Sequence, residues 1–92
     1  MIVSIKHKGL RLLWIKNDAS WFPSDHIVKI MDILTRLEAA MEIEDMNFDG
    51  SKLHPLKGDL AGFWSVYVKA NWRIIFRFED GEAHLIDYLD YH

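Results

Sequence analysis

The chain of 92 residues contains no cysteine, only two prolines and no apolar run of membrane-spanning length. Without cysteine it can form neither a disulfide framework nor a thiolate metal site. The apolar start, residues 1–5, is too short for a signal peptide and charged residues follow it, so we expect a cytoplasmic protein. Half of the residues are apolar and 27% are charged. This composition predicts one folded domain over residues 1–92 rather than a disordered chain.

Charges of one sign are missing from whole segments. Residues 1–16 hold four basic and no acidic residues, and residues 79–92 hold five acidic and no basic ones. Between them, residues 17–50 are strongly acidic and residues 51–78 carry five basic residues against one acidic. The net charge of −3 argues against a nucleic-acid binder. The alternation still permits one basic face, although a mixed, solvated surface is the simpler interpretation.

The spacing of apolar residues in the first half predicts a short strand and two helices. Residues 2–5 form a strand-like run, and residues 8–18 fit a short helix. Residues 21–25 then supply a break and a cap, with a proline suited to a first helical turn. The second helix is predicted from apolar residues spaced three and four apart, a stripe that is typical of a core-facing surface. This stripe comprises Ile27, Ile30, Met31, Leu34, Leu37 and Met41.

The second half is strand-like. Runs at 62–68, 72–78 and 83–89 are separated by turn signals at Ala70–Asn71 and Asp80–Gly81. Alternation in the middle run points Arg73 and Arg77 away from the core, where they could grip a phosphate or a carboxylate. The order β-α-α-β-β-β predicts an α+β domain, with two helices packed on a largely antiparallel sheet. The opposite, core-facing set is Trp72, Ile74, Phe76 and Phe78.

The chain ends in three residues able to do proton chemistry, Asp90, Tyr91 and His92. In an extended segment Asp90 and His92 share a side, and a carboxylate beside a histidine fixes the tautomer of the ring. A terminal ion pair of little energetic value is the alternative. A second alternative is a metal site, although no HExxH-like spacing occurs and Lys57 and Arg73 would repel a cation. Its donors would be His54, His84, Asp87, Asp90 and His92.

Five segments together resemble the HigB branch of the RelE-type bacterial toxins. They are KHKGL at 6–10, KLHPLKGD at 52–59, GFWS at 62–65, ANWRI at 70–74 and the terminal DYH, so the resemblance runs from end to end. It implies a ribonuclease without metal or cofactor that cuts messenger RNA in the ribosomal A site. The ribose 2′-hydroxyl would attack the adjacent phosphorus and leave a 2′,3′-cyclic phosphate and a 5′-hydroxyl. The implied partners are a helix-turn-helix antitoxin of the HigA type and the 30S subunit, with no membrane contact and DNA contact only through the antitoxin.

The resemblance points to six catalytic positions. We expect His92, oriented by Asp90, to be the leading acid or base, although the sequence does not separate the base from the acid. Tyr91 would stack on a base or donate a hydrogen bond. A catalytically inactive module that only regulates its antitoxin is the alternative to an enzyme. The catalytic candidates are His54, Lys57, Arg73, Asp90, Tyr91 and His92, and the expected phosphate-binding residues are Lys6, Lys8, Arg11, Lys52, Lys69 and Arg77. For His7, His26 and His84 we expect only surface or strand positions.

Overall fold

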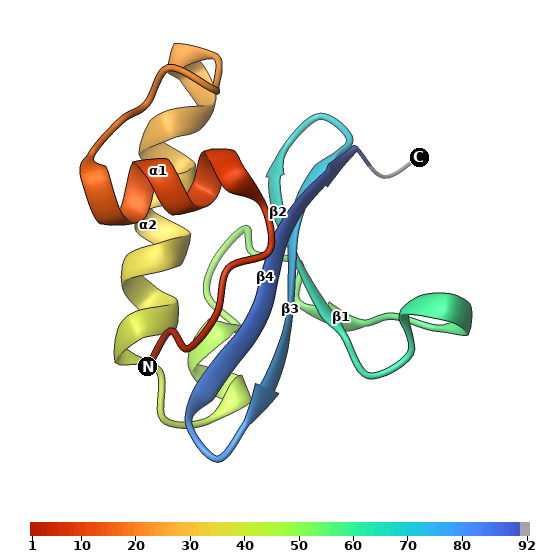
Figure 1. The fold of residues 1–92 in the computed structure, drawn as a ribbon. Helices are drawn as coiled ribbons and strands as arrows, with labels where there is room; N and C mark the ends of the chain where they lie inside the picture. Colours follow the sequence, from red (N-terminus) through yellow and green to blue (C-terminus); the bar gives the residue numbers. More distant parts are fainter. Residues whose placement is uncertain (91–92) are drawn as a thin grey trace.

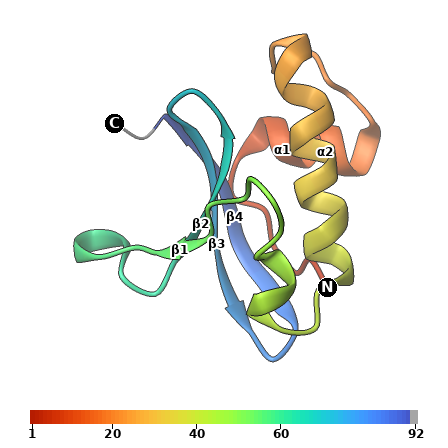
Figure 2. The ribbon, with the colours of Figure 1, turned by 180° about the vertical axis from the view of Figure 1, so that it is seen from behind.

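Two helices cover one face of a four-stranded antiparallel sheet in a computed structural model, which describes residues 1–90. Figures 1 and 2 show both helices on one side of the sheet, whereas the segment around β1 and η2 projects from the other side. This arrangement confirms the predicted α+β class. No helix within residues 1–90 is long and apolar enough to cross a membrane. The elements are α1 (Lys8–Lys16), α2 (Ser24–Ala39), η1 (Ile43–Met46), β1 (His54–Pro55), η2 (Gly58–Leu60), β2 (Trp64–Lys69), β3 (Trp72–Glu79) and β4 (Glu82–Asp90), and the strands lie in the order β1-β2-β3-β4.

The N-terminal segment runs beside β4 in the parallel direction. The strand expected at residues 2–5 is reduced to two isolated bridges, Ile2 to Ala83 and Ile5 to Ile86. Side chains of both helices also form hydrogen bonds with backbone groups of this segment. The Arg11 guanidinium donates to the carbonyls of Ile5 at 2.9 Å and Lys6 at 2.8 Å, and the Ile2 N–H donates to the Glu38 carboxylate at 2.8 Å. The start of the chain is therefore fixed to both the sheet and the helices.

The core lies between the helices and the sheet. The apolar stripe predicted for α2 and the core-facing residues predicted for β3 meet there, because the helix repeat and the strand alternation each gather apolar side chains on one side. Burying one such large side chain contributes roughly 1.5–3 kcal/mol. The fully buried large apolar residues are Leu10, Ile30, Ile33, Leu34, Leu37, Met46, Val66, Ile74, Phe76 and Ile86.

The ends of both helices differ from the prediction. The first helix stops at Lys16 rather than Asp18, because Asn17 is left-handed with φ of 56° and its N–H donates to the carbonyl of Leu13. The second helix stops at Ala39, and Ala40 is already extended. The assignment of Met41 to the buried stripe was wrong, because its side chain is 79% exposed beyond that helix end. The turns predicted at Ala70–Asn71 and Asp80–Gly81 are confirmed, with left-handed backbone at Ala70, Asp80 and Gly81.

Candidate functional site

The face of the sheet opposite the helices carries the predicted arginines. Strand register pairs Tyr67 with Arg73, and it pairs Ser65 with both His54 and Ile75. Side chains that pair directly across strands share a face, and Val66 and Ile74, one residue away, point into the core. His54 and Arg73 therefore lie on the same face, which we call the open face. Arg77 also lies there, with its guanidinium 4.9 Å from the ring centroid of Phe63.

A tyrosine holds two cations together on the open face. The Lys52 ammonium lies 4.6 Å, and the Arg73 guanidinium carbon 4.7 Å, from the centroid of the Tyr67 ring. Cations on an aromatic face are attracted by the ring quadrupole. Arg73 also donates to the carbonyls of Ala70 and Trp72, each at 3.1 Å. The guanidinium is thus fixed at a defined point where an anion could approach it.

The hydrogen bond of His54 defines which ring nitrogen can accept a proton. His54 is exposed on β1, and its Nδ1 lies 2.9 Å from the carbonyl oxygen of Lys52. A carbonyl oxygen can only accept, so Nδ1 carries the hydrogen and the neutral ring keeps its lone pair on Nε2. Pro55, the next residue, favours the extended backbone observed at this strand. His54 can therefore act as a base through Nε2.

The remaining catalytic candidates are only partly brought together. Lys57 is exposed and precedes η2, on the segment that projects beyond β1. Asp90 ends β4 and pairs with Trp72, so strand alternation places it on the helix-covered face rather than with His54 and Arg73. Tyr91 and His92 lie outside the described residues. The structure thus assembles His54 and Arg73 on one face, with Lys57 on the adjacent loop.

The phosphate-binding candidates divide between the two sides of the sheet. Lys52 and Arg77 lie on the open face. On the helix side, the Lys8 ammonium lies 6.0 Å from the Trp21 ring centroid, and Arg11 and Lys6 are joined through the carbonyl described above. Lys69 forms an exposed ion pair with Asp25 at 2.6 Å, and this contact holds the pKa of Asp25 below its usual value.

The described members of the alternative metal set do not form a metal site. Within residues 1–90, no group of three or more histidine and carboxylate side chains lies close enough to hold an ion. His84 instead lies beside Glu82, with 3.4 Å between its Nε2 and the carboxylate oxygen.

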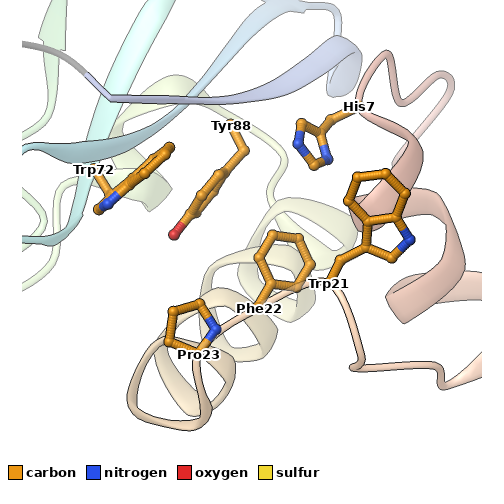
Figure 3. A pocket seen from close by; sticks show the side chains of 6 residues that line it. All are labelled: His7, Trp21, Phe22, Pro23, Trp72 and Tyr88. Atoms are coloured by element: carbon orange, nitrogen blue, oxygen red, sulfur yellow. The ribbon is translucent and has the colours of Figure 1, made fainter.

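A cavity of about 170 Å³ lies on the helix side, between the N-terminus of α1 and the end of the sheet. Figure 3 shows its walls, which are mostly aromatic. Trp72 stacks on Tyr88 with the centroids 4.6 Å apart. Tyr88 is buried, while Trp72, which was predicted to face the core, is only half-buried. Burial raises the pKa of Tyr88 to about 12, and the carboxylates of Asp25 and Asp90 add to this shift. The lining residues are His7, Trp21, Phe22, Pro23, Trp72 and Tyr88.

Two histidines on this side have structural roles that the sequence pattern did not predict. His26 is buried, and its Nδ1 is hydrogen-bonded to the Tyr88 hydroxyl, so its expected surface position was wrong. The signal was present, because His26 lies four residues before Ile30 and so falls on the buried side of α2. His7 caps α1 by accepting the Leu10 N–H at its Nδ1, 3.2 Å away. Neither histidine belongs to the open face.

The cap formed by His7 should make the stability of the domain depend on pH. Burial, assisted by the Arg11 guanidinium and opposed by Asp87, lowers the pKa of His7 below 6.5. Since the unfolded chain then binds the proton more readily, the free energy of unfolding should fall as the pH drops below about 6.5 and level off below the folded pKa. The loss should approach about 1 kcal/mol, the usual contribution of an N-cap bond.

Urea unfolding at pH 7.5 and 5.0 measures this loss. His7→Asn is the control, because asparagine caps a helix without titrating in this range. The lowered carboxylate pKa values of Asp18, Asp25 and Asp45 act at more acidic pH and do not interfere. If the wild type and His7→Asn lost the same free energy of unfolding between the two pH values, His7 would not be the source of the pH dependence.

Comparisons with known proteins agree with one another. A family model described as the RelE-like toxin HigB of type II toxin–antitoxin systems matches residues 3–92. The curated Endoribonuclease HigB of Proteus vulgaris is 49% identical over 92 residues, which cover all of both chains. A YoeB/ParE toxin from Agrobacterium tumefaciens has the same fold, with a TM-score of 0.60 and 25% identity over 99% of this chain and 98% of the other. A YoeB–YefM complex from Staphylococcus aureus also has a TM-score of 0.60, with 14% identity over 100% and 95% of the chains. The chain therefore belongs to the HigB family of RelE-like toxins of type II toxin–antitoxin systems.

Proposed function

We propose that this toxin is an endoribonuclease that cuts messenger RNA in the A site of the ribosome. The observation that carries the proposal is the open face, where a histidine with a defined lone pair lies on the same side of the sheet as two cations joined by one aromatic ring. The full-length similarity to an endoribonuclease HigB supports the same activity. Endoribonuclease activity follows from these two lines of support together.

The proposed reaction needs a base, cations and an acid. A base removes the proton of the ribose 2′-hydroxyl, whose oxygen attacks the adjacent phosphorus, and the bond to the 5′-oxygen breaks. The products are a 2′,3′-cyclic phosphate and, once an acid has protonated the departing oxygen, a 5′-hydroxyl. Negative charge that develops on the phosphate is stabilised by fixed donors nearby.

The residues of this chain can be assigned to each of those needs. His54 accepts a proton through Nε2, Arg73 binds two phosphate oxygens through its planar fork, and Lys57 and Lys52 add positive charge. Tyr91 and His92 would complete the set from the chain end, with His92 as the partner acid or base and with Asp90, at the end of β4, orienting it. We propose that these side chains act without a metal ion or cofactor, because the two cations beside Tyr67 can supply the charge stabilisation.

The proposed partners follow from the family and from the charge. A type II toxin is paired with a protein antitoxin, here proposed to be of the helix-turn-helix HigA type, and the structural relative YoeB from Staphylococcus aureus forms a complex with YefM. DNA would be contacted only through the antitoxin, and the compartment would be the cytoplasm, where the 30S subunit is found. Because phosphate contacts release counterions, binding to programmed ribosomes should weaken as salt increases.

Arg73 provides the test of the proposed function. Primer extension on a defined message in programmed ribosomes should show codon-positioned cuts with the wild type. Arg73→Ala should slow them about 100-fold, the usual cost of removing one fixed donor to a developing oxyanion. Arg73→Lys should restore little of the rate, because an ammonium lacks the bidentate fork. Arg36→Ala is the matched control, since Arg36 is an exposed arginine of α2, paired with Asp32.

The outcomes of this experiment separate the candidate functions. If the wild type makes no cuts, the toxin is a module that only regulates its antitoxin. If Arg73→Ala cuts as fast as the wild type, the nuclease remains and the assignment of Arg73 fails. If added EDTA abolishes cleavage on ribosomes that stay intact, the metal-free mechanism fails.

A further inference from the structure

We propose that Lys52 is a positioning residue, whose left-handed backbone aims its carbonyl at His54 and so presents the Nε2 of that ring to the RNA. The effect on cleavage rests on the proposed function, whereas the positioning itself can be measured without any RNA. Lys52 would thus have a backbone role in addition to the side-chain charge that made it a phosphate-binding candidate.

The backbone of Lys52 adopts a conformation that L residues rarely adopt. Its φ is +49°, in the left-handed region where a Cβ crowds the following carbonyl. The carbonyl that this conformation turns toward β1 is the one that accepts from His54 Nδ1 at 2.9 Å. A lysine has no side-chain oxygen to stabilise the left-handed conformation, so the surrounding structure must impose it.

The neighbours of Lys52 show how the conformation is imposed. On one side, Ser51 is buried, its N–H donates to the Phe48 carbonyl at 2.9 Å, and its own carbonyl accepts from Tyr67 at 2.7 Å. On the other side, His54 is held in register with Ser65 of β2. Both ends of this four-residue link, residues 51–54, are therefore attached to the same strand, and Lys52 must make the turn between them.

The side chain of Lys52 returns to the same strand. Its ammonium lies over the Tyr67 ring, which Arg73 contacts as well. One residue therefore sets the tautomer of His54 through its carbonyl and adds to the charge beside Arg73 through its ammonium. The two contributions can be separated, because the backbone role depends on φ and the electrostatic role depends on charge.

Two uncharged substitutions of similar size differ strongly in how well they tolerate the left-handed region. Lys52→Asn removes the charge but keeps the conformation, since asparagine is enriched there. Lys52→Val removes the charge and opposes the conformation, because a branched Cβ is a rare outlier at positive φ. A difference between these variants therefore reports on the backbone, while a loss common to both reports on the ammonium.

The primary measurement is the tautomer of the His54 ring, read from long-range nitrogen–proton NMR spectra of the free toxin at neutral pH. We expect the Nδ1–H form in the wild type and in Lys52→Asn, and a shift toward Nε2–H in Lys52→Val. Cleavage on programmed ribosomes should be at least about tenfold slower for Lys52→Val than for Lys52→Asn, a fraction of what a positioned base contributes.

The spectra decide the proposal even if a variant fails to fold. An Nε2–H ring in the wild type would overturn it without recourse to any variant. An unchanged Nδ1–H ring in a folded Lys52→Val would overturn it as well. If the tautomer follows the expectation but the wild type does not cleave RNA, the positioning role stands and the proposed nuclease function fails.

Discussion

Replacing His54 by alanine should slow cleavage on programmed ribosomes by about 100-fold or more, the range over which a positioned acid or base contributes. The reason is local. The ring is exposed on the open face, its Nδ1 is occupied by the Lys52 carbonyl, and its Nε2 is available for proton transfer. Because His54 makes no core contact of note, the folded state should persist, and single-turnover rates should report the chemical step.

A second histidine provides the matched control. His84 pairs with Arg77 across the sheet, so it occupies the same face, but it is engaged with Glu82 and stands apart from the cations on Tyr67. His84→Ala should therefore leave the rate within about twofold of the wild type, as expected for a surface substitution away from the site. Equal losses of cleavage rate in His54→Ala and His84→Ala would mean that any such substitution on the open face slows cleavage. The assignment of His54 as a catalytic acid or base would then fail.

Replacing Phe76 by alanine should lower the free energy of unfolding by about 3–5 kcal/mol. Phe76 is completely buried at the centre of β3, and its ring meets that of Phe78 edge-on, with 6.5 Å between the centroids. Truncation removes the buried surface and leaves a cavity that the sheet cannot fill by relaxing. In a domain whose total stability is about 5–15 kcal/mol, such a loss is close to unfolding it.

Urea unfolding followed by circular dichroism measures this effect. Phe78→Ala is the control, because Phe78 is only half-buried near the end of the same strand and should cost less. Phe76→Leu keeps most of the apolar volume and should give a measurable transition even if the alanine variant does not fold. Losses of the same size for Phe76→Ala and Phe78→Ala would contradict the central position of Phe76 in the core.

The elements could be predicted from the sequence because their signals are local. A helix repeat in residues 24–39 and an alternation in residues 72–79 each record which side faces the core. The same alternation predicts that Arg73 and Arg77 lie on the outer face, where the structure has them. Met41 was misplaced because the periodicity of the stripe continued past the residue at which the backbone leaves the helix.

The candidate site could be predicted only in part, because its geometry depends on register. The Tyr67 ring joins Lys52 to Arg73 only when β2 pairs with β3 in one particular alignment, and the sequence does not specify that alignment. The left-handed backbone of Lys52 had no signal either, since neither glycine nor asparagine stands at this position. The sequence pattern also does not show whether Asp90 and His54 lie on the same face of the sheet. His54 is on β1, which is two strands away from Arg73 on β3 in the sheet order.

The side chains along the first residues have a consequence for how the protein behaves at high concentration. A sheet edge with free N–H and C=O groups is a template on which another molecule can add a strand and begin to aggregate. Here Arg11 and Glu38 form hydrogen bonds with three backbone groups of the N-terminal segment. At the opposite border of the sheet, β1 has only two residues, one of which is Pro55 and has no N–H to donate. Both borders are thus blunted, and we expect copies of this toxin to have little tendency to join through the edges of their sheets.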